Sequence, residues 1–179
     1  MNNQIIKNNN GFTLVETMVA VIILTFTIAV FMNVVSNNYF YGKYARNEIT
    51  ANYLLQEVVD YIKNDRDTSI VLTQFTTDSW INFLDKYYEC SGDDGCTIDA
   101  YSGGKTICNG ECISLYYHST PNPNFYNYDP SGVATSFVRK IHFEQNADNL
   151  DQLDVTVTVD WKNGNLNKSK ELKTSIMKW

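Results

Sequence analysis

The stretch that decides the fold is residues 11–35, which read GFTLVETMVAVIILTFTIAVFMNVV. Its last 19 residues, Thr17 to Val35, contain no charged side chain, and no proline or glycine interrupts them. As a helix they would be about 28 Å long, which matches the roughly 30 Å hydrocarbon core of a bilayer. Helical threonines can donate to a carbonyl one turn earlier, so the polar residues of the run cost little in lipid. The run predicts a membrane-spanning helix.

One carboxylate, Glu16, stands at the head of this apolar run. An ionisable group in that position is costly, which makes it a candidate functional residue. A cleaved secretory signal would place small residues after the run, and the stretch from Phe31 to Asn37 does not provide them. A plain single-pass anchor would leave Glu16 unexplained.

Residues 11–16, GFTLVE, followed directly by an apolar run, resemble the processing site of type IV prepilins and pseudopilins. In that family a prepilin peptidase cuts after the glycine, and the new N-terminal residue is methylated. The resemblance implies cleavage between Gly11 and Phe12, N-methylation of Phe12, and a role for Glu16 in assembly. It also implies a single-pass protein of the cytoplasmic (inner) membrane with its domain outside the cytoplasm. The leader departs from the family pattern because Lys7 is its only cation.

The implied assembly role of Glu16 has a physical basis. In a filament, the buried carboxylate could pair with the Phe12 amine of a neighbouring subunit, which offsets part of the desolvation of both groups. A subunit at the wrong axial position would leave both charges unpaired. The partners implied by the resemblance are prepilin peptidase, other pilin or pseudopilin subunits bound through the N-terminal helix, an inner-membrane assembly platform, and lipid before assembly.

Helical periodicity continues beyond the apolar run. Ala51, Leu55, Val58 and Ile62 form one apolar stripe, and the pattern ends at about Asn64. The sequence therefore predicts four parts, namely a leader (1–11), a transmembrane or filament-core helix (12–35), its amphipathic continuation (36–65), and an extracytoplasmic globular domain (66–179).

The rest of the chain predicts a short helix and then mainly strands. Residues 153–161 alternate strictly between apolar and polar, which is typical of a half-buried antiparallel strand, and Asn163-Gly164 is a hairpin signal. The expected fold is α+β, a long N-terminal helix packed on a roughly four-stranded antiparallel sheet, as in the pilin-like lollipop. The tail from Trp161 to Trp179 is weakly similar to V-type minor pilins and to I-type minor pseudopilins of type II secretion. The predicted elements are a helix at 79–88 and strands at 113–117, 137–144, 153–161 and 172–176.

Four cysteines, Cys90, Cys96, Cys108 and Cys112, lie within 23 residues. An exported domain favours disulfides, and the loop-rich segment 90–112 needs such staples to become ordered. Sequential pairing and nested pairing both remain open, with a slight preference for the sequential one. A zinc site is disfavoured because the spacing is not that of a zinc ribbon. A calcium site is disfavoured because the nearby aspartates form no complete EF-hand pattern.

The sequence contains no credible catalytic set. Neither His118 nor His142 lies in a catalytic motif, so we expect no enzyme activity, no cofactor and no metal. The net charge of −6 makes nucleic acid an improbable partner. The expected function is a structural subunit, a minor pilin or pseudopilin of a type IV pilus or type II secretion system. Two alternatives are a tip or adhesive subunit that uses the aromatic loop 116–128, and a DNA-uptake pseudopilin.

Overall fold

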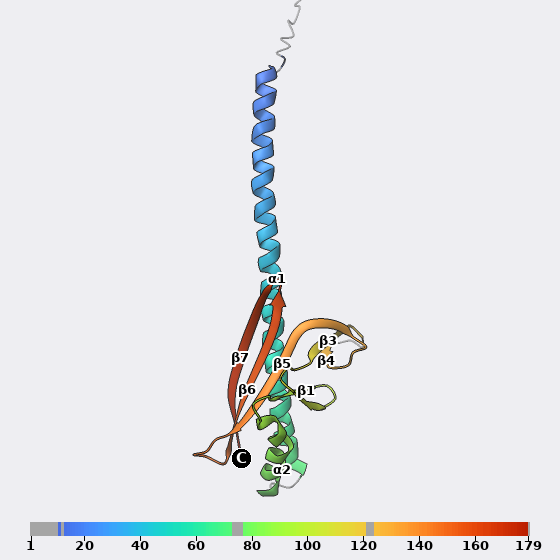
Figure 1. Cartoon of the computed structure of the whole chain (residues 1–179), viewed down its shortest axis with the longest axis vertical. Helices are drawn as coiled ribbons and strands as arrows, with labels where there is room; N and C mark the ends of the chain where they lie inside the picture. Colours follow the sequence, from blue (N-terminus) through green and yellow to red (C-terminus); the bar gives the residue numbers. More distant parts are fainter. Residues whose placement is uncertain (1–10, 12, 73–76, 121–123, 179) are drawn as a thin grey trace, which may run out of the picture. The chain divides into compact units, whose positions relative to one another are not determined.

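The computed structural model describes residue 11 and residues 13–72, 77–120 and 124–178. Residues 1–10 of the predicted leader, Phe12 and Trp179 therefore lie outside the described residues, whereas Gly11 is described. The first element is the helix α1, Leu14–Leu72 (Figure 1). The contacts divide the chain into two units, one that ends at Lys43 and one that begins at Tyr44.

In the first unit, every described side chain from residue 13 to residue 43 is exposed. No proline lies in this range, so nothing interrupts the hydrogen-bond ladder of the helix. Among the described residues, α1 is the one helix that is long and apolar enough to cross a membrane, with a mean hydropathy of 2.6 in its apolar window.

In the second unit, residues 44–72 of α1 pack against a sheet. The predicted stripe is confirmed, because Ala51, Leu55, Val58 and Ile62 are all buried. The helix continues to Leu72, beyond the predicted end near Asn64. Asp65 accepts hydrogen bonds from two side chains of the next helix, and Ile70 is buried, so this last part has tertiary support that local propensity does not show.

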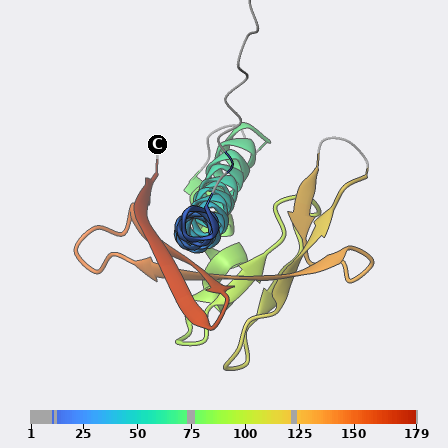
Figure 2. The same cartoon turned by 90° about the horizontal axis from the view of Figure 1, so that it is seen from above.

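The sheet is antiparallel and is built around one long central strand, β5. On one edge of β5 lie β6 and then β7, and on its other edge the short hairpins β1–β2 and β3–β4 pair with it in turn. Residues 44–72 of α1 run over one face of this sheet, with β7 to one side and β3–β4 to the other (Figure 2). The strands are β1 Cys96–Ile98, β2 Lys105–Ile107, β3 Ser114–His118, β4 Phe125–Asn127, β5 Val133–Gln145, β6 Gln152–Asn163 and β7 Leu166–Met177.

The expected α+β class is confirmed, but the sheet has seven described strands rather than about four. The four predicted strands correspond to β3, β5, β6 and β7. The three additional strands have only three residues each, which is too short for a period of two to stand out. The tight hairpin between β6 and β7 turns at Gly164, whose φ of 62° lies in the left-handed region.

A second helix, α2 (Thr77–Tyr87), precedes the sheet and continues into a 3₁₀ turn, η1 (Tyr88–Ser91). Trp80, Phe83 and Tyr87 are buried on one face of this helix. Their rings pack in sequence, and Tyr87 stacks on Phe143 of β5 with ring centroids 4.8 Å apart. The core of the second unit therefore lies between α1, α2 and one face of the sheet.

Candidate functional site

The N-terminal end of α1 holds the described residues of the predicted processing site. Gly11 is exposed, and the helix begins at Leu14. Thr13 caps it, because its Oγ1 accepts a hydrogen bond from the Glu16 backbone N–H at 3.3 Å. The helix dipole favours an anion in the first turn, where Glu16 lies. Among the described residues, no cation lies within ion-pair distance of the Glu16 carboxylate.

The polar side chains in the apolar run hydrogen-bond to their own helix. Thr17, Thr25 and Thr27 each donate from Oγ1 to the carbonyl three residues earlier at 2.8 Å. Asn33 donates to the carbonyl of Ala29 at 3.0 Å. These groups therefore need no partner outside the helix, and the run can enter an apolar environment without orphaned hydroxyl donors. Glu16 lies directly before this run, and no described side chain of its own helix forms an ion pair with its carboxylate.

A family model supports this interpretation of the N-terminus. Residues 6–32 match the model described as the prokaryotic N-terminal methylation motif. This is the type IV prepilin signature. The matched residues include Gly11, Phe12 and Glu16, and the match ends before the second unit begins. The prepilin motif supports a type IV pilin-like or pseudopilin precursor. Searches of curated proteins and of solved structures gave no match.

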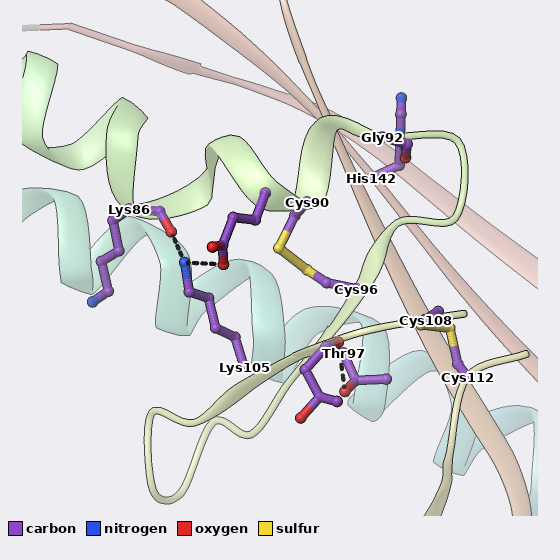
Figure 3. The surroundings of a disulfide bond; sticks show 11 residues. Lys86, Cys90, Gly92, Cys96, Thr97, Lys105, Cys108, Cys112 and His142 are labelled. Atoms are coloured by element: carbon purple, nitrogen blue, oxygen red, sulfur yellow. Dashed lines mark hydrogen bonds and ion pairs between the residues drawn. A yellow bond between two sulfur atoms is a disulfide. The ribbon is translucent and has the colours of Figure 1, made fainter. Parts of the chain in front are cut away.

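The four cysteines form two disulfides in the second unit. Cys90 pairs with Cys96, and Cys108 pairs with Cys112, which is the sequential pairing (Figure 3). The sulfurs are therefore not available as thiolate ligands for zinc. Among the described residues, no group of three or more histidine, cysteine, aspartate or glutamate side chains is arranged to hold a metal ion.

The loop closed by the first disulfide is fastened to β5. The Gly92 carbonyl contacts Nδ1 of His142 at 3.2 Å, and the Asp93 carbonyl accepts a hydrogen bond from Nζ of Lys140 at 3.0 Å. Gly95 has a φ of 62°, and a Cβ there would lie 2.7 Å from the Ile141 carbonyl oxygen. His142 and Lys140 lie on the face of β5 opposite the buried Arg139 and Ile141, and they position this loop.

The hairpin β1–β2 supports the end of α2. The Nζ of Lys105 donates to the Lys86 carbonyl and lies 3.4 Å from the Glu89 carboxylate (Figure 3). A cation near the last carbonyls of a helix is favourable because it opposes the helix dipole. The segment 90–112 therefore contacts α2 through Lys105 and contacts β5 through the loop at Gly92 and Asp93.

Sequence reasoning missed Arg139, which is fully buried on β5. Its Nη1 donates to the Leu54 carbonyl at 3.0 Å and to the Glu57 carboxylate at 2.7 Å, and its Nη2 donates to the Ile98 carbonyl at 2.8 Å. One guanidinium thereby joins α1, β5 and β1. The alternation along β5 could have indicated this burial, because residues 139 and 141 are two positions apart and therefore face the same side of the strand.

A second buried polar contact joins the two helices of the second unit. The Tyr87 hydroxyl donates to Asp65 at 2.8 Å, and Lys86 forms an ion pair with the same carboxylate at 2.7 Å. Burial, and then the nearby Asp65 charge, raise the pKa of the Tyr87 hydroxyl far above its usual range. The hydroxyl therefore remains a hydrogen-bond donor at any physiological pH, which keeps the end of α1 attached to α2.

Of the aromatic loop 116–128, residues 116–120 and 124–128 are described, and their rings pack largely within the fold. The Phe125 ring stacks between His118 and Tyr101, with centroid distances of 4.9 and 4.6 Å. Tyr126 and Tyr128 pack against the hydrophobic core. Burial raises the pKa of both hydroxyls. These two rings therefore contribute to the stability of the domain.

Proposed function

We propose that this chain is a structural subunit of a type IV pilus or of a type II secretion pseudopilus, either a minor pilin or a pseudopilin. Prepilin peptidase hydrolyses the Gly11–Phe12 bond, and a methyl group is added to the new Phe12 amine. The observation that carries the proposal is the match of residues 6–32 to the N-terminal methylation motif. The leader lies in the cytoplasm, the apolar run spans the inner membrane, and the domain lies outside.

The exposed apolar helix supports assembly as the purpose of processing. In the part of the chain that the structure describes, the apolar side chains from Leu14 to Val35 are all exposed. They must be covered by lipid before assembly and by equivalent helices in a filament. Moving from lipid to a bundle of helices keeps these side chains in an apolar environment, so residues 12–35 can serve as anchor and filament core in turn.

Glu16 determines the axial position that a subunit takes when it moves from lipid into the filament. Processing creates an amine four residues before the carboxylate, and each charge is costly in an apolar surrounding unless it meets an opposite charge. A subunit whose Glu16 meets the Phe12 amine of its neighbour offsets both costs. The subunit docks on the assembly platform and on other subunits in the position that makes this pair.

The terminal mass of the membrane-extracted chain tests the processing step. We expect a chain that starts at Phe12, carries one added methyl group and lacks four cysteine protons. Gly11→Val should block cleavage without harming the fold, because a Cβ on Gly11 meets no atom within 4 Å. Gly42→Val is the matched control, since that position is equally open. A wild-type chain that keeps Met1 would refute the proposal.

A Glu16 variant tests the assembly step separately. We expect Glu16→Ala chains to be cleaved normally but to be depleted from filaments when wild-type subunits compete. Glu16→Gln keeps the shape and removes the charge, so it should behave like Glu16→Ala. Normal incorporation of both variants would show that the carboxylate does not set the register.

A further inference from the structure

The charge of the second unit is distributed very unevenly. The strand β7 holds three lysines and one glutamate, so it carries a net charge of +2 in a chain whose net charge is −6. Among the described strands β7 pairs only with β6, so it is an edge strand of the sheet. The sheet therefore ends in a basic edge.

A groove with the opposite character lies on the other side of α1, between the helix and β4. It has a volume of about 410 Å³. Its acidic groups are Glu57 and Asp60 of α1, and its aromatic rings include Tyr53, Phe125 and Tyr126. No lysine or arginine is among the described residues that line it. We call this the acidic groove.

The acidic groove has the chemistry that accepts lysine side chains. Aromatic faces attract an ammonium group and cover its aliphatic stem, and the carboxylates offer an ion pair at the tip. Glu57 already pairs with the buried Arg139 at 2.7 Å, and among the described residues Asp60 forms no ion pair, so Asp60 is the carboxylate that a lysine would meet first. Tyr53 and Asp60 are exposed on the same helix and form the open rim.

We propose that the basic edge of one subunit docks in the acidic groove of a second copy of this chain. The proposal rests on the proposed function, because it supplies a contact between the domains of neighbouring subunits. The two surfaces lie at opposite edges of the sheet, so one copy cannot satisfy both through a single two-fold contact. Such a head-to-tail contact does not close on itself in a dimer and can extend into a helical array.

The lysines on β7 differ in how firmly they are engaged within the subunit. Lys170 forms an ion pair with Glu48 at 3.0 Å, and its carboxylate partner is part of α1. Lys168 lies over the Tyr44 ring, 5.4 Å from its centroid. Lys173 is the most exposed of the three and pairs only with Glu171 on its own strand, at 3.2 Å. Lys173 can therefore exchange its partner at the lowest cost, because exposed ion pairs are weak.

Edge lysines also have a common protective role, since they prevent sheets from pairing edge to edge. Edge protection predicts no partner for the acidic groove, whereas docking predicts a contact between the groove and β7. A cross-linking experiment distinguishes the two explanations. A zero-length carbodiimide joins a carboxylate to an amine only when they are in contact. The reagent is applied to the full-length chain in isolated filaments, and the covalent dimer is isolated and digested.

We expect the dimer to contain a peptide link between Asp60 or Glu57 and a lysine of β7. Asp60→Lys should lower the yield of this dimer about tenfold, the order expected for one lost close charge pair. Lys173→Asp should lower it to a similar extent, and the double variant should recover it. Asp148→Lys, which makes the same charge change at an exposed site in the β5–β6 loop, is the matched control.

The outcomes separate this proposal from the proposed function. A processed chain whose dimers are linked through other peptides, or not at all, would overturn the docking of β7 in the acidic groove and leave the subunit function intact. Links between β7 and a different protein would also overturn it. An unprocessed chain that forms no filament, read from its mass in the same sample, would refute the proposed function itself.

Discussion

The two parts of α1 have the same secondary structure and opposite surroundings. From residue 13 to residue 43 every described side chain is exposed, although most of them are apolar. From Tyr44 onward seven helix residues are buried, and polar residues occupy the other faces. The second part has its apolar partner in the same chain, namely the sheet. The first part has no such partner among the described residues, and the proposed function assigns it lipid or another subunit.

The difference implies that the two parts of one helix take part in two separate equilibria, the folding of the domain and the insertion or assembly of the chain. Changes in residues 44–72 act on the folding of the domain, where the cost of a lost contact appears as a lower free energy of unfolding. Under the proposed function we expect changes in residues 14–43 to act on insertion and assembly and to leave the free energy of unfolding unchanged. Paired substitutions in the two parts can break or sharpen this separation.

The largest effect is expected at Arg139, the buried cation that joins the second part of α1 to the sheet. Arg139→Ala removes the donors to Leu54, Glu57 and Ile98. We expect the free energy of unfolding to fall by about 3 to 5 kcal/mol, because two buried carbonyls lose their donor and a large cavity is left behind. Urea unfolding of the detergent-extracted chain, followed by near-ultraviolet circular dichroism, measures this. The control is Lys140→Ala, which changes the next residue, on the outer face of β5. It should lower the free energy of unfolding by less than about 1 kcal/mol.

Arg139 also shows where sequence reasoning stops. Strict alternation and helical spacing predicted β6, α2 and the buried stripe of α1, because burial on one face leaves a periodic signature. Alternation assigns residue 139 to the inner face of β5, but it does not reveal which carbonyls would make a buried guanidinium tolerable. Those acceptors come from α1 and β1, far away in the sequence. β1, β2 and β4 were missed for a different reason, because three residues are too few for an alternating pattern to be recognised.

For the candidate site the situation was reversed. Residues 11–16 carried a local motif, and the matched family model contains it. The pairing of the cysteines could not be fixed from spacing, because the sequential and nested alternatives both close plausible loops. The structure has the sequential pairing, with Cys90 on η1 and Cys96 at the start of β1. The position of each cysteine on its element, which spacing does not encode, decides the pairing.

The next effect is expected from the same substitution made in the two parts of α1. Leu55 is buried and Leu24 is exposed. Leu55→Ala should lower the free energy of unfolding by about 2 to 5 kcal/mol, through lost burial and the cavity left behind. Leu24→Ala should leave the urea midpoint of the domain unchanged. Equal losses in the two variants would show that the two parts of the helix fold as one cooperative unit.

A charge placed in the first part should act on insertion alone. Ile23→Lys puts an ammonium group near the middle of the apolar run, at a cost of about 2.5 to 3.5 kcal/mol for membrane insertion. We expect the variant to be depleted from the membrane fraction after carbonate washing, while its urea midpoint stays at the wild-type value. Gln56→Lys, on an exposed position of the second part, is the control. Normal retention of Ile23→Lys in the membrane would contradict a spanning role for this run.

The smallest effect is expected from acid, and it should be confined to the second unit. Ser175 and Gln152 donate to the Asp154 carboxylate at 2.6 and 2.8 Å, and these hydrogen bonds lower its pKa. An unfolded aspartate has a pKa of about 3.9, so the folded state gains stability from this carboxylate above that pH. The gain is lost as the pH falls from there through the lowered pKa of the folded state.

Asp154→Asn should therefore reduce stability slightly at neutral pH and flatten the loss of stability below about pH 4. Urea midpoints measured from pH 7 down to pH 2 give both quantities, with Asp148→Asn in the β5–β6 loop as the control for a lost surface charge. A steep acid limb retained in Asp154→Asn would assign the pH dependence to other carboxylates.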